Sequence, residues 1–268
     1  MIKDVTLGQY FPGESFVHKL DARVKILALI IYIVAVFLCK GAASYGVCAA
    51  FIILCVAVSR ISFKMILRSL RAIIIIVIFT AILNLLYTPG EAIFTVWIIK
   101  VTKEGIRIAL SMAVRIILLV IASALLTYTT SPMSLTDGLE SLLSPLKKIK
   151  VPVHEFSMMI TIALRFIPTL IDETNKIMSA QKARGADLES GNIIKRAKAL
   201  IPILVPLFVS SFRRADELAT AMECRLYHGG EGRTRLHVLK YGKRDLLGML
   251  AVLTASAAAV FLALYFGI

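Results

Sequence analysis

The stretch A-I-I-I-I-V-I-F-T-A-I-L-N-L-L, Ala72–Leu86, decides the fold of this chain. It carries no charge, and its polar side chains are one threonine and one asparagine. A run this long and this apolar is typical of a helix that crosses a lipid bilayer, because a helix pairs its own backbone N–H and C=O groups where no water can do so. The turn sequence Tyr87-Thr88-Pro89-Gly90 ends the run.

The composition of the whole chain agrees with a membrane protein. Hydrophobic residues make up 58% of the 268 residues, and the mean hydropathy is +0.83, whereas soluble domains are about half apolar. The net charge of +14 has three interpretations: nucleic-acid binding, attraction to anionic lipid, and the excess of Lys and Arg typical of cytoplasmic loops. Because the basic residues are interleaved with acids, the topology signal is favoured and no nucleic-acid partner is expected.

The other long apolar runs are Ile26–Leu38, Ala42–Val58, Ile108–Tyr128 and Leu246–Phe266. Together with Ala72–Leu86 they predict about five transmembrane helices, and this number places all the strongly basic segments on one side of the bilayer. We therefore expect an all-α integral membrane protein of the cell (cytoplasmic) membrane. Residues 1–130 would hold four spans, residues 131–245 long cytoplasmic or interfacial helices, and residues 246–268 the last span. The N-terminus and residues 131–245 are expected in the cytoplasm.

The connector Ser59–Arg71 has the pattern of a basic amphipathic helix. Its basic residues are spaced by four, four and three positions and so share one helical face: Arg60, Lys64, Arg68 and Arg71. The opposite face is apolar: Ile61, Met65, Ile66 and Leu70. We expect a separate helix that lies on the cytoplasmic membrane surface, in contact with the bilayer.

Two smaller features of the first 130 residues also lead to expectations. The apolar piece Ile93–Val101 is too short to cross a bilayer. Arg115 lies near one end of the fourth run, where it can either reach the membrane interface or pair inside the helix bundle. Because it is only about two helical turns into the run, we expect it at the interface.

The middle of the chain contains apolar segments of a different kind. Val153–Ile171 is interrupted by Pro168, and A-L-I-P-I-L-V-P-L-F-V-S-S-F, Ala199–Phe212, is apolar on every side but too short to span comfortably. Three possibilities stay open for them. In the first, Ala199–Phe212 is an apolar helix at the membrane boundary. In the second, it is a docking surface for another membrane protein. In the third, the two segments form a hairpin of transmembrane helices that places residues 172–198 on the opposite side.

Two stretches in this region have nearly the same pattern: S-A-Q-K-A-R-G, Ser179–Gly185, and T-A-M-E-C-R-L, Thr220–Leu226. Each has a hydroxyl residue, Ala, two variable positions, a small residue and Arg. Glycines follow both, so both are expected at the C-terminal ends of helices. Small residues allow another backbone to approach, and the planar fork of Arg can bind carboxylates or carbonyls. The alternative is a chance repeat in alanine-rich helices.

Three stretches resemble one family, the T component of energy-coupling factor transporters. They are G-Q-Y-F-P-G-E-S-F-V-H-K-L-D-A-R-V-K, Gly8–Lys25; A-R-G, Ala183–Gly185; and A-M-E-C-R-L-Y-H-G-G-E-G-R-T-R, Ala221–Arg235. The last departs from the family pattern at Cys224, where Ala is usual, and at Leu226, where a small residue is usual. The resemblance covers nearly the whole chain.

The resemblance implies a transmembrane coupling subunit of an ATP-driven importer of vitamins or metal ions such as cobalt and nickel. Two long coupling helices would each end in an arginine motif that inserts into a groove of one of two ATPase subunits. The implied groove-binding residues are Ala183, Arg184, Gly185, Cys224, Arg225 and Leu226. A membrane-embedded substrate-binding subunit, the S component, would dock on an apolar surface formed by Leu200, Ile201, Ile203, Leu204, Leu207 and Phe208.

The sequence argues against an enzyme. No G-x-x-x-x-G-K-[ST] occurs, so ATP and magnesium are expected in the partner subunits, and no cofactor is expected in this chain. The four cysteines lack metal-ligand spacing and are expected mainly as core fillers, and no nucleophile–base set is evident. The alternative function is a stand-alone secondary transporter, which should carry acidic residues within its spans; none occurs in the runs above.

Overall fold

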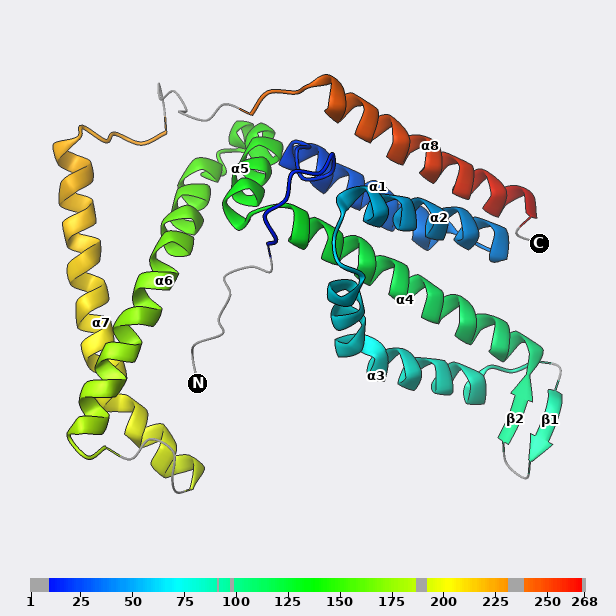
Figure 1. The fold of residues 1–268 in the computed structure, drawn as a ribbon, viewed down its shortest axis with the longest axis horizontal. Helices are drawn as coiled ribbons and strands as arrows, with labels where there is room; N and C mark the ends of the chain where they lie inside the picture. Colours follow the sequence, from blue (N-terminus) through cyan, green and yellow to red (C-terminus); the bar gives the residue numbers. More distant parts are fainter. Residues whose placement is uncertain (1–9, 91, 97–98, 187–191, 231–238, 267–268) are drawn as a thin grey trace. The chain divides into compact units, whose positions relative to one another are not determined.

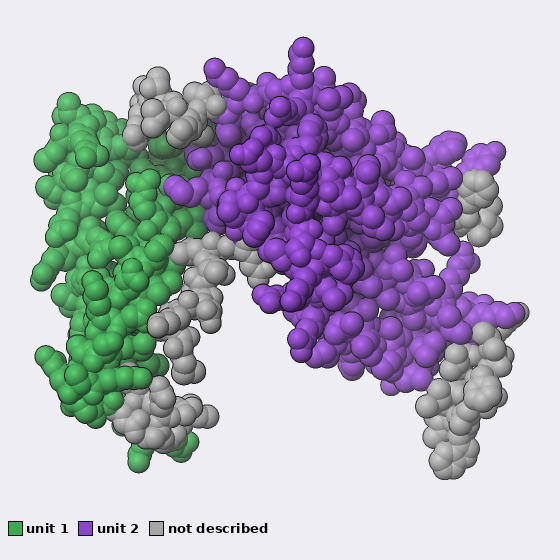
Figure 2. Space-filling view, in the orientation of Figure 1, with its two compact units in different colours: residues 1–7, 143–238 green, residues 8–142, 239–268 purple. Residues whose placement is uncertain are grey.

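The computed structural model describes residues 10–90, 92–96, 99–186, 192–230 and 239–266. The chain divides into two compact units, coloured separately in Figure 2. The bundle unit comprises Gly8–Leu142 and Leu239–Ile268, and the two-helix unit comprises Met1–Leu7 and Leu143–Val238. The expected boundaries at residues 130 and 245 concern membrane topology and stay a prediction.

The bundle unit is built on apolar helices that run side by side (Figure 1). In chain order its helices are α1 (Ala22–Leu38), α2 (Ala42–Ser59), α3 (Phe63–Tyr87), α4 (Lys103–Thr129), α5 (Pro132–Leu143) and α8 (Lys243–Phe266). Helices α1 and α2 both pack against α4 and α8, and α3 packs against α4. Gly41, at φ 85°, makes the tight turn from α1 to α2 because this backbone conformation strains any residue with a side chain.

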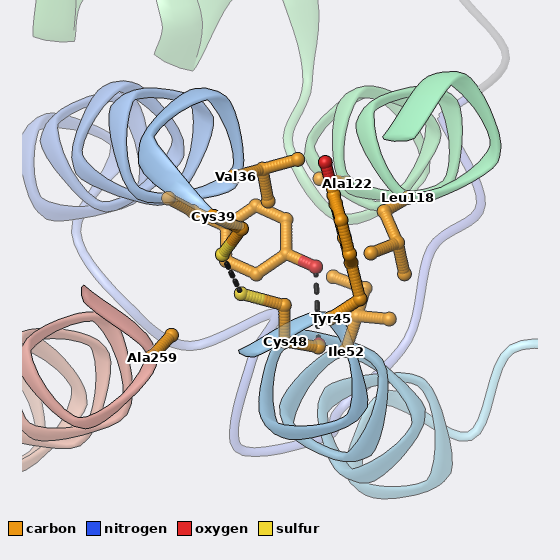
Figure 3. Close-up of a cluster of buried hydrophobic side chains, with 9 residues drawn as sticks. Val36, Cys39, Tyr45, Cys48, Ile52, Leu118, Ala122 and Ala259 are labelled. Carbon is orange, nitrogen blue, oxygen red and sulfur yellow. Dashed lines mark hydrogen bonds between the residues drawn. The ribbon is translucent and has the colours of Figure 1, made fainter. Parts of the chain in front are cut away.

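The core of the bundle lies where α1, α2, α4 and α8 meet (Figure 3). The Tyr32 hydroxyl donates a hydrogen bond to the Cys48 carbonyl at 3.1 Å. The thiols of Cys39 and Cys48 lie 3.6 Å apart, and both residues are buried, as expected for cysteines that fill a core. Small side chains such as Ala122 of α4 and Ala259 of α8 complete the cluster, so the helices can approach closely.

Arg115 of α4 pairs inside the bundle. Its Nη2 donates to the hydroxyl of Tyr45 on α2 at 2.8 Å, and its guanidinium lies 5.6 Å from the ring centroid of Phe37. The structure therefore shows the pairing inside the bundle, and the position of this arginine relative to the membrane interface stays a prediction. The α1–α2 turn brings two aromatic side chains to the level of Arg115, and a cation is stabilised over aromatic faces.

Lys25 and its hydrogen-bond acceptors close one end of the bundle. The Lys25 side chain is buried, and its ammonium donates to the carbonyl of His18 at 3.1 Å, the carbonyl of Thr129 at 2.9 Å and the hydroxyl of Thr130 at 3.2 Å. These three acceptors come from the segment before α1 and from the end of α4. One buried charge therefore joins distant segments of the chain, since Lys25 and Thr129 are 104 positions apart in the sequence.

The connector Ser59–Arg71 has the basic and apolar faces that we expected, but it does not form a separate helix. Ile61 and Ile66 are buried against Tyr128, and the basic residues Lys64, Arg68 and Arg71 are exposed. However, Phe63–Tyr87 is one uninterrupted helix, which changes direction along its length in Figure 1. Arg60 adopts a left-handed conformation at φ 56° and ends α2. The chain thus turns at Arg60, and the basic segment became the first part of the third apolar helix because nothing in it stops a helix.

The short apolar piece forms two antiparallel strands, β1 (Ala92–Val96) and β2 (Ile99–Thr102). The register pairs Ala92 with Thr102 and Val96 with Ile99, with an irregularity between Ala92 and Phe94. Four or five residues rich in β-branched side chains favour a strand over a helix this short. The hairpin is a small addition to a fold that is otherwise helical, which confirms the expected class.

The two-helix unit contains a short 3-10 helix, η1 (Ser144–Ile149), followed by α6 (Val153–Ala183) and α7 (Ile193–Cys224). Pro168 lies inside α6, and Pro202 and Pro206 lie inside α7. Pro168 thus interrupts the apolar run but not the helix, and Ala199–Phe212, expected as a short apolar segment, is part of one long helix. A proline removes one backbone hydrogen bond and bends a helix, but the flanking helix formers continue it, and Figure 1 shows α7 bending along its course.

Five described helices are long and apolar enough to cross a membrane, by length and composition: α2, α3, α4, α6 and α8. An 18-residue window in each has a mean hydropathy of 2.2, 2.4, 2.5, 1.2 and 2.3 respectively, so α6 is clearly the least apolar. The number agrees with the sequence-based expectation, but α6 takes the place of α1, which has 17 residues. Exposed apolar side chains such as Ile75 (75%) and Phe79 (61%) on α3 are typical of contact with lipid.

The start of α1 is held to the start of α8 by a charged network. Asp21 caps α1, and its Oδ2 lies 2.8 Å from Arg23 Nη2. The Asp21 backbone N–H donates to Asp245 Oδ1 at 2.7 Å, and the Arg23 guanidinium lies 3.9 Å from the ring centroid of Tyr241. Burial by itself raises the pKa of Asp21, but the hydrogen bonds and charge of Arg23 outweigh it and hold that pKa below its ordinary value.

We expect Asp21 to make the stability of the bundle depend on pH in the acid range. Because its folded-state pKa is lowered, Asp21 stabilises the fold at pH values above the ordinary pKa of about 3.9, and this stabilisation is lost as the pH falls through the lowered value. Asp21→Asn should cost about 1–3 kcal/mol at neutral pH, the usual contribution of a charged hydrogen bond. Thermal unfolding in detergent at pH 7 and pH 3 should show the two proteins converging in acid; a constant difference would contradict the assignment.

Candidate partner-docking site

The first arginine motif lies at the C-terminal end of α6. The helix ends at Ala183, Arg184 is its C-cap, and Gly185 adopts φ 84°. The Gly185 N–H donates to the Lys182 carbonyl at 3.0 Å, and the Ala186 N–H donates to the Gln181 carbonyl at 3.0 Å. These two bonds make a Schellman motif, the arrangement in which glycine after the C-cap reverses the chain. The sequence-based prediction of a helix stop at Gly185 is confirmed.

The second arginine motif ends α7 in the same way. The helix ends at Cys224, and the next residue, Arg225, occupies the C-cap position. The Leu226 N–H donates to the Glu223 carbonyl at 2.8 Å, and the Tyr227 N–H donates to the Met222 carbonyl at 3.0 Å. Leu226 adopts φ 57°, so a leucine occupies the left-handed position that Gly185 occupies in the first motif.

The two motifs are equivalent in backbone geometry and in exposure. Both arginines are C-cap residues followed by a left-handed residue, and all six motif residues are exposed: Ala183, Arg184, Gly185, Cys224, Arg225 and Leu226. Among the residues that the structure describes, neither guanidinium has an ion-pair partner. The unpaired carbonyls at a helix C-terminus favour a cation there, so both guanidinium groups are well placed to bind an acceptor on another protein.

Helices α6 and α7 form an antiparallel hairpin held by polar contacts. Glu173 of α6 accepts hydrogen bonds from the Ser210 hydroxyl and, at 2.9 Å, from Arg214 Nη2 of α7. Near the end of α6, Gln181 Nε2 donates to the Pro202 carbonyl at 3.4 Å. Because Glu173 pairs with Ser210 while Gln181 pairs with Pro202, the two helices run in opposite directions and their register is fixed.

The expected docking surface is largely exposed on α7. Ile201 is 54% exposed and Phe208 62% exposed, and Leu200 and Leu204 are exposed to a similar degree. Leu207 is half-buried. Ile203 was wrongly included in the expected surface. It is 3% exposed, since its side chain is buried inside the protein, and so it cannot contact a partner on this face.

Further exposed apolar residues extend this surface beyond the expected set. They are Val205, Val209 and Phe212. The spacing of positions 201, 205, 208 and 212 is helical, so it could have been read from the sequence if Ala199–Phe212 had been treated as part of a long helix. We call Ile201, Leu204, Val205, Phe208, Val209 and Phe212, together with Leu200, the apolar face of α7. Such a contiguous exposed apolar face is typical of a protein or membrane contact.

Comparison with known proteins places the chain in a family. A family model described as "Cobalt transport protein", CbiQ, matches residues 13–236, which include both arginine motifs. The chain belongs to the CbiQ family. A curated relative from Acidaminococcus fermentans is 54% identical over 262 residues, with 98% of each chain covered. Another, from Clostridium kluyveri, is 53% identical over 269 residues and covers 100% of both chains. Both are named "Energy-coupling factor transporter transmembrane protein EcfT".

Membership of the CbiQ family agrees with the fold described above. The chain is a multi-pass membrane protein of the energy-coupling factor transporter class, and the resemblance drawn from its three sequence stretches is confirmed. In the first stretch residues 8–9, and in the last residues 231–235, lie outside the described residues. The fold and the family do not by themselves assign a function to the exposed arginines or to the apolar face of α7.

Proposed function

We propose that this chain is the coupling subunit of an energy-coupling factor importer. Two ATPase subunits bind its two arginine motifs, and a membrane-embedded substrate-binding S component binds the apolar face of α7. The observation that carries the proposal is the equivalence of the two helix ends, each with an exposed C-cap arginine, Arg184 or Arg225, in a Schellman motif. Two copies of one docking element fit a pair of related subunits.

The chemistry of each surface supports its assigned partner. An exposed arginine without an ion-pair partner among the described residues is suited to a groove that offers carboxylates or carbonyls, which its planar fork binds in a fixed orientation. The apolar face of α7 carries side chains such as Ile201 and Phe208, which are costly to leave in water. An apolar membrane protein is therefore the partner that this face fits best.

In this proposal ATP and magnesium are bound by the ATPase subunits, and the chain itself is non-catalytic. In this proposal the arginine motifs face the cytoplasm, where ATP is available, and the N-terminus and residues 131–245 are assigned to the same side. Helix α6 then acts as a coupling helix and not as a span, although its length and composition are sufficient for one. The α6–α7 hairpin couples the two arginine motifs, because the contact of Glu173 with Arg214 joins the two docking helices. The imported substrate is a vitamin or a metal ion recognised by the S component.

Purification of the tagged chain from native membranes in mild detergent tests the proposal. We expect ATPase subunits and a small apolar membrane protein to co-purify in fixed ratios, and the complex to hydrolyse ATP while the chain alone does not. The matched control is the same tag on an unrelated five-helix membrane protein. Substrate uptake by vesicles that contain only this chain would contradict the proposal and favour a stand-alone secondary transporter.

A further inference from the structure

Leu226 is the residue that distinguishes the two otherwise equivalent helix ends. Both Schellman motifs place the residue after the C-cap in the left-handed region, at φ 84° for Gly185 and φ 57° for Leu226. Glycine adopts this conformation freely, whereas the Cβ of any other L residue crowds its own backbone there. Leucine at this position is therefore unfavourable for the helix end itself.

The Leu226 side chain is also left in solvent. It is 76% exposed, among the most exposed large apolar side chains of the described residues. Backbone strain and exposed apolar surface thus occur at one residue, and packing among the residues that the structure describes leaves its side chain 76% exposed. Residues held in sparsely populated conformations concentrate at functional sites, where another molecule supplies the compensation.

We propose that Leu226 fills an apolar pocket in the ATPase groove that receives Arg225, and that this contact prevents the α7 motif from exchanging grooves with the α6 motif. The proposal rests on the proposed function, because the groove belongs to an ATPase subunit. The partner surface would combine an acceptor for the guanidinium with an adjacent pocket lined by aliphatic or aromatic side chains. Leu226 follows Arg225 directly, so one approach of the helix end delivers both groups.

The α6 motif presents the opposite requirement. A Cβ added at Gly185 would meet nothing within 4 Å, so atoms of this chain leave that position open. The groove that receives Arg184 can therefore close directly onto the Gly185 backbone, and a leucine would not fit there. Discrimination between two similar sites is strongest when the wrong pairing creates a clash as well as losing a contact.

Variants of Leu226 separate the side chain from the backbone conformation. Asparagine tolerates the left-handed region, so Leu226→Asn keeps the backbone and replaces the apolar side chain by a polar one. Leu226→Gly removes the side chain and relieves the strain. Leu226→Met keeps an apolar side chain of similar size. These three variants and Gly185→Leu can be compared in one series.

The series is measured by titrating the ATPase subunits that co-purify with the wild-type chain, after separation and fluorescent labelling, against each purified variant in detergent. We expect Leu226→Asn and Leu226→Gly to lower the affinity about tenfold or more, because burial of a leucine is lost, and Leu226→Met to stay within about threefold. Gly185→Leu should weaken binding at the α6 end. Leu226→Gly should leave the thermal stability of the free chain unchanged or raise it.

The outcomes distinguish this proposal from the proposed function. If Leu226→Asn and Leu226→Gly bind the ATPases like the wild type while Arg225→Ala does not, the pocket is refuted and the coupling function stands. If the wild-type chain binds no ATPase at all, both are refuted. A double variant with Gly185→Leu and Leu226→Gly that binds like the wild type would refute the assignment of one motif to one groove.

Discussion

Replacement of both Arg184 and Arg225 by alanine is expected to abolish the binding of ATPase subunits while the chain still inserts into the membrane. Each arginine is an exposed C-cap residue, so its removal leaves the helix and the bundle core intact. Truncating one partner of a charge pair buried at an interface costs about 2–5 kcal/mol, or roughly 30- to several-thousand-fold in affinity. Two such losses in one complex would bring substrate uptake to background.

The single variants make this prediction more specific. Arg184→Ala and Arg225→Ala should each release ATPase from one end of the α6–α7 hairpin, so the remaining complex holds less ATPase per chain. The measurement is the ratio of ATPase to this chain after affinity purification, together with substrate uptake by cells. In the proposed complex uptake requires both motifs, so we expect each single variant to lose most of its transport even where some ATPase stays bound.

Other arginines on the same helices provide matched controls. Arg165 of α6 and Arg213 of α7 are exposed and lie outside the motifs. Arg165→Ala and Arg213→Ala remove the same charge from the same helices, so both should purify with normal amounts of ATPase. If these controls lose as much ATPase as the motif variants, net charge and not the helix ends governs the interaction. Normal binding by the double motif variant would contradict the docking role.

Replacement of Lys25 by methionine is expected to destabilise the bundle unit by about 3 kcal/mol. Methionine has a similar length but no donors, so three oxygen acceptors around the buried ammonium lose their partner. Each buried polar group left without a hydrogen bond costs about 1–3 kcal/mol, and partial hydration recovers some of this. For a chain of this size the loss corresponds to a fall of about 5–10 °C in the unfolding temperature.

The buried thiols of the core report this unfolding directly. Cys39 is 1% exposed and Cys48 2%, so a thiol-reactive dye should label them only as the bundle opens on heating. Cys224 is exposed and Cys55 is partly exposed, so the assay is made in a Cys55→Ser, Cys224→Ser background that leaves only the two buried thiols. Lys40 is exposed at the end of α1, and Lys40→Met should change the temperature little. Equal temperatures for the Lys25 and Lys40 variants would refute the role assigned to Lys25.

The sequence predicted the apolar helices well because their signal is local. A continuous run such as Ala72–Leu86 permits little else in a membrane. The faces of Ser59–Arg71 were also correct, since Ile61 and Ile66 are buried as the helical spacing required. The helix end at Gly185 was predictable for the same reason, because glycine is the residue that best accepts a left-handed backbone.

The sequence did not predict features that depend on distant contacts or on competing local signals. Pro168 interrupts the apolar run Val153–Ile171, and Ala199–Phe212 looked too short to span, but both segments belong to long helices, α6 and α7, that pack against one another. Lys25 looked like an ordinary flanking charge, since its acceptors include the Thr129 carbonyl, 104 residues away. The left-handed conformation of Leu226 is also invisible in the sequence, because leucine rarely adopts it.

The antiparallel register of α6 and α7 has a mechanical consequence. Gln181, close to the first motif, lies beside Pro202, and the second motif ends α7 at Cys224. At 1.5 Å per residue the two motifs are therefore held about 33 Å apart along the hairpin. A helix does not stretch under modest force, so the distance between the two motifs along the hairpin stays fixed. If the proposed ATPase subunits bind at its two ends and move closer together, the hairpin has to pivot at the Glu173 contact or bend at the α7 prolines, and the apolar face would then rotate.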